Sequence, residues 1–418
     1  MDDTSGKPRP AATLTKAEQE ERLALHRRFP TAHDLRRQAM RNMPNFSFEY
    51  MDGGAGADTG IQRNWRALDS VELIPRYGRV IAPPSAETTL FGQQYSAPIG
   101  IAPIGGPGTA FPGAETYLAR AAQRANVPYT LGLLSGIDME QGADLAPDVL
   151  WYQLYRFSKN NHKIGLDLTR RAQAAGVKVL MLTIDTPIRT TRPREVRSGI
   201  MNPFKLTMRL RQDAMMSPRW LSSLRRHGVP RFTALQPYMP GNLSIAEAAA
   251  FIRSEQGGAF TWDEVKLYRD TWQGPLMLKG ILHPDDAEKA VELGVDGLLV
   301  SNHGGRQIDA LPSSIDVLPA IRKQVGDRAT IILDSGVRSG TDVARAVALG
   351  ADAAFAGKSF LWSLGALGEK GPGHLIHIYT EDVRATLGQL GCLSVDELCN
   401  VPRRHPGAYS LEDFAPPA

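Results

Sequence analysis

The heptapeptide SNHGGRQ, residues 301–307, combines an amide, an imidazole and a guanidinium with two glycines. It directly follows the apolar run VDGLLV and presents an imidazole, His303, and a guanidinium, Arg306, beside two glycines. The glycines suit a tight turn, because glycine adopts positive φ values at little steric cost. The turn needs neither His303 nor Arg306. Imidazole transfers protons near neutral pH and guanidinium binds anions, so this stretch is a candidate site.

Eight short apolar or β-branched runs recur from residue 96 onward, and each precedes a turn and then a helical stretch. The helices are recognised by their ends, as in HPDDAEKAVELG, where Pro284 suits the first turn and Gly294 the end. Strands that are apolar on both faces and alternate with helices predict an α/β fold, a closed parallel (β/α)8 TIM barrel rather than an open sheet. The runs are 96–103, 128–132, 149–155, 179–185, 275–280, 297–302, 330–336 and 353–358.

Polar side chains follow most of these runs, and in a (β/α)8 barrel the carboxyl ends of the strands meet at one rim. Each side chain has an ordinary explanation when taken alone, as a rim charge, a packed aromatic or a helix cap. Burying so many ionisable groups together without a ligand would cost several kcal/mol, so we expect a ligand at this rim. The residues are Gln153, Tyr155, Thr183, Asp185, Lys279, Ser301, Asn302, His303, Arg306, Asp334, Arg338, Gly357 and Lys358.

Two glycine-bearing turns, DSGVRSG (334–340) and AGKSF (356–360), follow the seventh and eighth expected strands. Barrels commonly bind phosphate there through backbone N–H groups, with Arg338 and Lys358 supplying the opposite charge. A dinucleotide fingerprint is absent, because GGPGTAFPG (105–113) has the wrong spacing. His374 and His377 form a lone pair better explained as surface residues than as zinc ligands, so no metal is expected.

Composition excludes several classes of protein. The 418 residues are 42% hydrophobic and 22% charged, as in soluble globular proteins. A net charge of +4 over 45.6 kDa is too dilute to indicate nucleic-acid binding. Cys392 and Cys399 form neither a disulfide framework nor a metal motif. Without an apolar run of about 18 residues or a secretory h-region, we expect a cytoplasmic protein.

The chain divides into a flexible N-terminal arm (1–30) and one domain (31–418) that opens with a helical segment, 33–51. The connection after the fourth strand, about 188–262, is too long for an ordinary loop and is expected to be a lid insertion. Within it, residues 204–232 contain seven basic residues against the single acid Asp213. This segment is either a solvated lid helix or an amphipathic surface, with Trp220, Leu221 and Leu224, that contacts an anionic membrane. The basic residues are Lys205, Arg209, Arg211, Arg219, Arg225, Arg226 and Arg231.

Five motifs, FEYMDGGAG-x-D, LTIDTP, LKG, SNHGGRQ-x-D and DSGVRSG, resemble the FMN-dependent 2-hydroxy acid oxidases and dehydrogenases over roughly residues 30 to 400. That family includes glycolate and lactate oxidases, mandelate dehydrogenase and flavocytochrome-type lactate dehydrogenases. The resemblance implies a (β/α)8 barrel that binds FMN and oxidises an L-2-hydroxy acid to the 2-oxo acid. It also implies an electron acceptor, which is a quinone, a protein or O2, and a homotetramer.

The same resemblance assigns roles to individual residues. His303 would accept the hydroxyl proton and Asp185 would orient it, while Lys279 would stabilise the reduced flavin. Four residues would bind the substrate carboxylate: Arg192, Arg306, Tyr50 and Tyr155. Beside the flavin the cofactor would be held by Pro103, Ile104 and Gly105, and at the flavin edge by Gln153, Thr183 and Ser301. Asp334 would hold the ribityl chain, and Arg338, Gly357 and Lys358 the phosphate. Gly336 is a further cofactor-binding residue.

Departures from the family pattern refine this expectation. Ile104 replaces a usual Thr and Gly132 a frequent Ser, which removes two side-chain contacts to flavin. Gly105 favours a dehydrogenase over an oxidase, and Leu134, in place of an aromatic residue, favours a bulkier substrate. Two alternatives remain: a non-redox, phosphate-binding lyase or isomerase using Lys279 as a Schiff base, and a catalytically silent binding protein. The second is disfavoured because His303, Asp185, Arg192 and Arg306 are all present.

Overall fold

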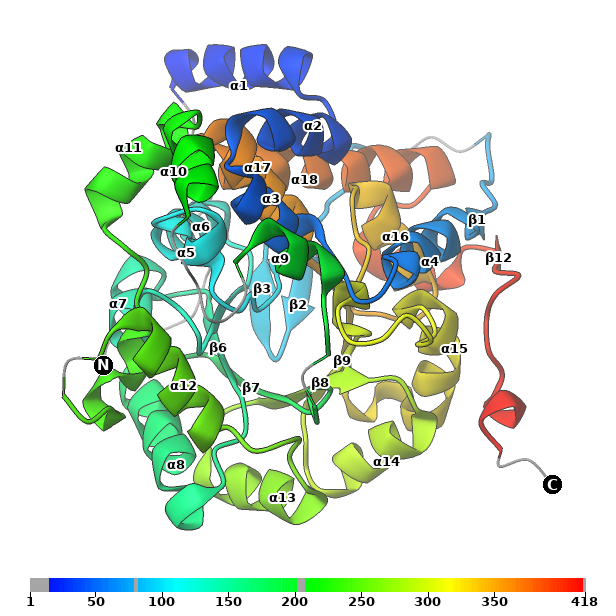
Figure 1. The fold of residues 1–418 in the computed structure, drawn as a ribbon. Helices are drawn as coiled ribbons and strands as arrows, with labels where there is room; N and C mark the ends of the chain where they lie inside the picture. The colour runs from blue at the N-terminus through cyan, green and yellow to red at the C-terminus, as the bar shows by residue number, and fades with distance from the viewer. Residues whose placement is uncertain (1–14, 79–81, 189, 201–206, 242, 416–418) are drawn as a thin grey trace, which may run out of the picture.

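The computed structural model describes residues 15–78, 82–188, 190–200, 207–241 and 243–415. Its centre is a closed barrel of eight parallel strands, shown along its axis in Figure 1. All eight predicted runs supply a strand, and β11 pairs with β4 to close the ring, which confirms the predicted fold. The strands are β4 (Ile99–Ile101), β5 (Tyr129–Gly132), β6 (Leu150–Leu154), β7 (Val179–Thr183), β8 (Leu276–Ile281), β9 (Gly297–Val300), β10 (Thr330–Leu333) and β11 (Ala353–Ala356).

The barrel is plugged at its amino-terminal end by a hairpin of β2 (Thr88–Leu90) and β3 (Gln93–Tyr95). Its Phe91 ring lies edge-on to Trp151 at 5.6 Å, and Trp151 Nε1 donates to the Tyr95 hydroxyl at 3.2 Å. Trp151 in turn packs on Phe355, with ring centroids 5.2 Å apart. Aromatic side chains therefore fill this end, and the opposite, carboxyl end remains for a ligand.

Helices surround the barrel, and a repeated sequence, AV-x-LG-x-D, shows how two of them join the next strand. In each copy the aspartate bonds the first residues of the preceding strand: Asp296 accepts from Leu276 N at 2.8 Å, and Asp352 from Ile331 N at 2.6 Å. The outer helices are α6 (Ala114–Ala125), α7 (Met139–Leu145), α8 (Lys159–Ala174), α13 (Trp262–Thr271), α14 (Pro284–Glu292), α15 (Ser314–Val325), α16 (Gly340–Ala348), α17 (Lys358–Leu367) and α18 (Lys370–Leu390).

The N-terminal region is more ordered than expected. Residues 16–28 of the predicted flexible arm form a helix, α1 (Lys16–Arg28), started by a Thr15–Glu18 capping box, although none of its residues is buried. Residues 1–14 lie outside the described part. The helix predicted over 33–51 is split into α2 (Ala32–Asn42) and α3 (Asn45–Asp52), because Pro44 cannot donate a backbone hydrogen bond. The next helix, α4 (Thr59–Asp69), leads into the barrel.

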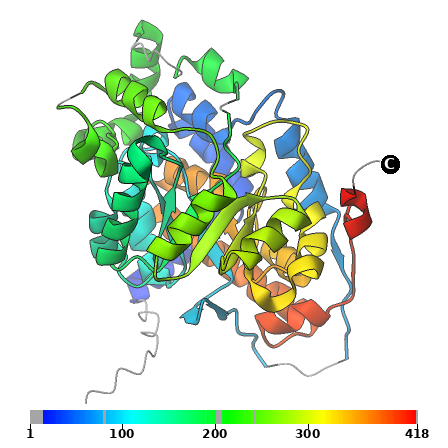
Figure 2. The same cartoon turned by 90° about the horizontal axis from the view of Figure 1, so that it is seen from below.

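The long insertion is mostly helical: α9 (Pro193–Ser198), α10 (Met208–Met215), α11 (Pro218–His227), the 3-10 turn η1 (Thr233–Tyr238) and α12 (Ile245–Glu255). Figure 2 shows α10 to α12 extending beyond one end of the barrel. Trp220 is only 8% exposed; it lies edge-on to Phe46, and its Nε1 donates to Ala110 O at 3.0 Å. Leu221 and Leu224 are partly buried and pack against the core, so all three of these side chains contact the protein itself.

The remaining elements are short. They are α5 (Pro107–Ala110), the pair β1 (Glu72–Leu73) and β12 (Arg403–Arg404), and the 3-10 turns η2 (His303–Gly305), η3 (Gly326–Arg328), η4 (Val395–Asn400) and η5 (Leu411–Phe414).

Candidate active site

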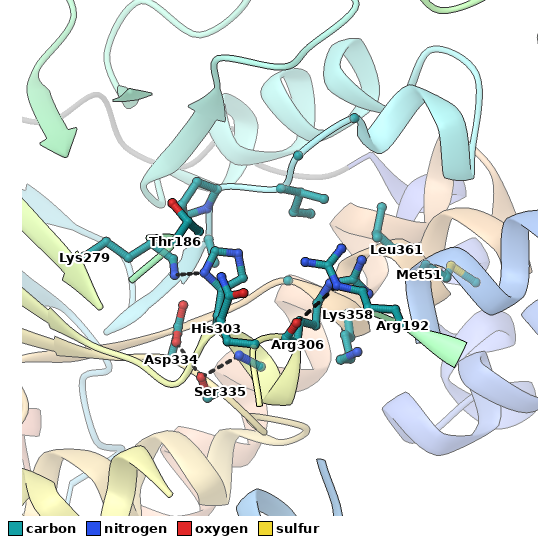
Figure 3. Close-up of a pocket in the computed structure, with 18 of the residues that line it drawn as sticks. Met51, Thr186, Arg192, Lys279, His303, Arg306, Asp334, Ser335, Lys358 and Leu361 are labelled. Carbon is teal, nitrogen blue, oxygen red and sulfur yellow. Dashed lines mark hydrogen bonds between the residues drawn. The ribbon is translucent and has the colours of Figure 1, made fainter. Parts of the chain in front are cut away.

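A cavity of about 650 Å³ opens at the carboxyl ends of the strands, within the usual range for small-molecule sites. The loops after several strands line it, together with α3, α4 and the insertion, and Figure 3 shows the cationic side chains converging there. Most predicted site residues line this cavity: Tyr50, Pro103, Ile104, Gly105, Tyr155, Arg192, Lys279, His303, Arg306, Asp334, Gly336, Arg338, Gly357 and Lys358. The other four, Gln153, Thr183, Asp185 and Ser301, lie directly behind them in contact with the lining or with each other.

His303 and Asp185 form a close pair at the cavity wall. His303 Nδ1 lies 3.0 Å from both Oδ1 and Oδ2 of Asp185. The His303 backbone has a φ of 59°, a left-handed conformation that is uncommon for a non-glycine residue and is typical of functional sites. The glycine of the LKG motif makes room for the pair, because a Cβ at Gly280 would collide with the Asp185 side chain.

Lys279 shares the same carboxylate, with its Nζ 3.3 Å from Asp185 Oδ2 and 3.2 Å from His303 Nδ1. Since Asp185 accepts hydrogen bonds from both neighbours, we assign the proton of neutral His303 to Nδ1. Nε2 then carries the free lone pair. This arrangement makes Nε2 the atom that can accept a proton from a ligand in the cavity.

Burial and the neighbouring charges determine the protonation states of Asp185, His303 and Lys279. Burial opposes ionisation of Asp185, but His303 and Lys279 overcome it and lower the Asp185 pKa to about 2. Burial lowers the pKa of His303, and so do the charges of Lys279 and Arg192, while Asp185 opposes them. Burial also disfavours charge on Lys279, yet Asp185 and Asp334 raise its pKa. At neutral pH the cluster therefore holds a carboxylate, an ammonium and a neutral imidazole.

Arg306 and Arg192 meet at a second carboxylate, Glu195, which the sequence analysis did not identify. Arg306 Nη2 donates to Glu195 Oε1 at 2.6 Å, and Arg192 Nη1 lies 3.2 Å from the same oxygen. Arg306 Nη1 also donates to Tyr50 O at 2.9 Å and to Gly53 O at 2.8 Å. The spacing R-P-R-E was the available signal, but a glutamate in the first turn of a helix is common for electrostatic reasons alone.

Two tyrosine hydroxyls lie near these arginines. Tyr50 packs under the Arg306 guanidinium, 5.5 Å from the ring centroid, and its hydroxyl donates to Gly105 O. Tyr155 lines the cavity, and burial raises its pKa above the ordinary value. Both rings can therefore act as neutral hydrogen-bonding groups beside an anion-binding pair.

The far end of the cavity suits a phosphate. Helix α17 begins at Lys358 without a side-chain cap, so its first N–H groups are available, and Gly357 lines the cavity beside them. Lys358 donates to Asp52 O at 3.1 Å and Gly53 O at 2.7 Å, while burial and the charge of Arg306 lower its pKa well below the usual value. An anion here would relieve that buried positive charge. Arg338, stacked over Trp65 and paired with Asp69 at 2.7 Å, adds a second cation.

The cavity also extends between Lys358 and Lys279, past Gly105. A Cβ at Gly105 would meet only the Tyr155 hydroxyl, at 3.9 Å, so this side of the cavity is open. A Cβ at Gly132 would lie 2.8 Å from Ile104 O, which explains why this chain has no side chain there. Behind the wall, Gln153 Nε2 donates to Thr183 Oγ1 at 2.8 Å, and Lys279 Nζ donates to Ser301 Oγ at 3.1 Å. These features fit FMN.

Further polar contacts, which sequence reasoning missed, hold the site together. Ser335 Oγ accepts from Gly304 N at 2.9 Å and donates to Asp334 at 2.8 Å. Asp309, the last residue of SNHGGRQ-x-D, accepts from Ala57 N at 2.7 Å. The two motifs thus dock on each other. Among the described residues, no cluster of His, Cys, Asp and Glu is arranged to hold a metal ion.

Arg194 anchors the start of the insertion to the N-terminal motif. It pairs with Glu49 at 2.5 Å and with Asp52 and Asp58 at 3.0 Å each. Three acids of FEYMDGGAG-x-D therefore position α9, the helix that follows Arg192 and contains Glu195.

Fold and site together define a flavin-dependent oxidoreductase, and comparison with known proteins gives its family. A model of the FMN-dependent dehydrogenase family matches residues 39–402. The L-lactate dehydrogenase of Caulobacter sp. (strain K31) is 35% identical over 366 residues, which cover 87% of this chain and 96% of that protein. The L-lactate dehydrogenase of Yersinia pestis (strain Pestoides F) is 36% identical over 366 residues, covering 87% and 95%.

Solved structures of mandelate-oxidising enzymes are also similar to this chain. The monotopic membrane protein (S)-mandelate dehydrogenase has a TM-score of 0.84 at 29% identity, covering 90% of this chain and 99% of that one. A mandelate oxidase has a TM-score of 0.76 at 32% identity with the same coverage. The chain belongs to the FMN-dependent dehydrogenase family and is an FMN-dependent 2-hydroxy acid dehydrogenase or oxidase. The predicted family, cofactor and reaction class are confirmed, and the comparisons give the lyase or isomerase alternative no support.

Proposed function

We propose that His303 is the general base of this enzyme and that Arg192 and Arg306 bind the carboxylate of an L-2-hydroxy acid. The observation that carries the proposal is the Asp185–His303 pair facing the same cavity as the two arginines. Nε2 of His303 accepts the hydroxyl proton, and Asp185 stabilises the resulting imidazolium. The free N–H groups of the arginines and the Tyr155 hydroxyl orient the carboxylate. Bound FMN supplies the two-electron acceptor.

The residues assigned to FMN come from the family resemblance and from their places in or behind the cavity lining. Lys279 provides fixed positive charge beside the flavin ring, and Gln153, Thr183 and Ser301 position it from behind. Pro103, Ile104 and Gly105 form one wall, and Asp334 and Gly336 flank the sugar chain. Lys358, Gly357 and Arg338 bind the phosphate together with the first N–H groups of α17.

The substrate carries an apolar side chain larger than a methyl group. Leu134, Ile200 and Phe232 line the cavity and would surround such a group. Arg253 of α12 and Gln256, the residue after this helix, also line it, so the insertion acts as a lid over the substrate. Anaerobic reduction of the flavin by L-2-hydroxy acids of increasing side-chain size tests this proposal. The ratio of the flavin-reduction rate constant to the substrate Kd is expected to be larger for branched or aromatic substrates than for lactate. A preference for glycolate would contradict the assignment.

The enzyme is a dehydrogenase that passes electrons to a quinone or a protein rather than to O2. Gly105 supports this choice, as do the relatives that carry the dehydrogenase name. Admitting air to the substrate-reduced enzyme tests it. Slow flavin reoxidation by air with fast reoxidation by a soluble quinone is expected, whereas rapid reoxidation by air would identify an oxidase.

The insertion contacts an anionic membrane surface. Among the described residues, no helix is long and apolar enough to cross a membrane. Met208, Met215 and Met216 are 68%, 64% and 82% exposed, and the neighbouring Arg225 and Arg226 are exposed cations. Co-sedimentation with vesicles containing phosphatidylserine, lost in Met215→Ser/Met216→Ser, would support the contact; absence of binding at low salt would exclude it.

Family resemblance further supports a homotetramer, which analytical ultracentrifugation would test.

A further inference from the structure

Glu195 is the most buried ionisable residue in the substrate end of the cavity that the proposed mechanism does not use. It lies in the first turn of α9, is 1% exposed, and lines the cavity. One of its oxygens, Oε1, lies 2.6 Å from Arg306 Nη2 and 3.2 Å from Arg192 Nη1. A buried carboxylate therefore sits between the two cations that are proposed to bind the substrate.

The contact has an electrostatic consequence for the two arginines. Burial lowers the pKa of Arg306, the charge of Arg192 lowers it further, and Glu195 opposes both. The two guanidiniums and Glu195 together carry a net charge of +1. Removing the carboxylate charge would leave two like charges facing each other in a cavity of low dielectric constant.

Glu195 also uses part of the hydrogen-bonding capacity of both arginines. The Nη1 group of Arg306 is held by the carbonyls of Tyr50 and Gly53, and its Nη2 group by Glu195. Nε of Arg192 donates to Arg306 O at 3.1 Å, which leaves part of each fork for a ligand. Guanidinium orientation is thus fixed before any substrate enters.

We propose that Glu195 is a positioning residue. Its negative charge reduces the net charge of the carboxylate site to about +1, which balances one substrate carboxylate and allows the 2-oxo acid product to be released. This inference rests on the proposed function, in which Arg192 and Arg306 bind the carboxylate. Without the negative charge of Glu195, a monoanionic product would experience a stronger field and would bind more tightly. The effect requires a charged ligand, which separates it from a purely structural role.

The test titrates the FMN-bound enzyme with pyruvate and with its neutral amide, pyruvamide, following the change in the flavin spectrum. Glu195→Gln keeps an oxygen acceptor for Arg306 but removes the charge. We expect the Kd for pyruvate to fall by roughly tenfold or more, since a unit charge at this range is worth more than 1.4 kcal/mol in a partly buried site. The Kd for pyruvamide should change by less than about twofold. Both kcat and KM should fall, because product release becomes slower and the anionic substrate also binds more tightly.

Glu140→Gln is the control, because Glu140 also pairs with an arginine, Arg171, and neither residue lines the cavity. Its pyruvate affinity should stay close to that of the parent enzyme. Weaker or unchanged pyruvate binding in Glu195→Gln, or an equal change for pyruvamide, would overturn the inference. Arg192→Met and Arg306→Met tell the two proposals apart: if neither weakens pyruvate binding, the carboxylate site itself is misassigned.

Discussion

Asp185 and His303, which are 118 positions apart in the chain, meet with Nδ1 of the imidazole 3.0 Å from the carboxylate. Asp185 follows β7 and His303 follows β9, with Lys279 on the strand between them. Neighbouring parallel strands therefore place the base, its orienting acid and a fixed cation side by side. The contact fixes the imidazole so that Nε2 is the basic atom.

Replacing Asp185 tests this arrangement. Asp185→Asn should lower the rate constant for anaerobic flavin reduction by about 10²-fold to 10⁴-fold, because the amide neither stabilises the imidazolium nor fixes the tautomer. Since Asp185 raises the pKa of His303, its loss should also move the acid limb of the pH profile to lower pH. Stopped-flow absorbance of the oxidised flavin measures both effects. A rate within a factor of about three of the parent would contradict the role of Asp185.

The pH profile of the parent enzyme follows from the same pKa directions. His303 must be neutral to accept a proton, and its pKa is lowered from the ordinary value of 6.5. We therefore expect kcat/KM to be constant between about pH 7 and pH 10 and, on the acid side, to fall only below pH 6.5. The basic limb should begin above pH 10, because the pKa of Tyr155 is raised from 10.0 and that of Lys279 from 10.5. An acid limb centred above pH 7 would show that His303 is not the titrating base.

Lys358 should strengthen FMN binding without stabilising the apoprotein against unfolding. Lys358→Met should raise the Kd for FMN by roughly 10-fold to 100-fold, the effect of losing one hydrogen bond to a charged group. The free energy of unfolding of the apoprotein should not fall, because the mutation removes a buried cation whose pKa is already lowered. Lys358→Arg should keep FMN affinity within a few-fold. Fluorescence titration with FMN and apoprotein unfolding measure the two effects, and unchanged FMN affinity in Lys358→Met would place the phosphate elsewhere.

The barrel and the location of the site were predictable because they follow from local pattern and topology. A strand buried on both faces must be apolar throughout, and closing eight such strands brings their carboxyl ends together whatever the detailed packing. The glycine-bearing turns before α16 and α17 were likewise visible in the sequence. For these reasons the polar residues at the carboxyl ends of β7, β8 and β9 were predicted to converge.

Pairings between distant charged residues were not predictable in the same way. Glu195 looks like an ordinary acid in a first helical turn until Arg306, 111 positions away, is placed against it. Nothing local distinguishes the apolar stripe of α11, with Trp220, as a face that packs on the protein rather than on a membrane. The sequence did contain Pro44, whose missing N–H divides the first predicted helix, and that signal was overlooked.

His303→Ala gives the most direct test of the central claim that this residue accepts the substrate proton. The variant should be purified with FMN bound and mixed anaerobically with the best L-2-hydroxy acid substrate, and the rate constant for bleaching of the oxidised flavin should be compared with that of the parent enzyme. We predict a decrease of at least about 10²-fold while the enzyme still binds FMN. Flavin reduction at more than about a hundredth of the parent rate would contradict the role of His303 as the base.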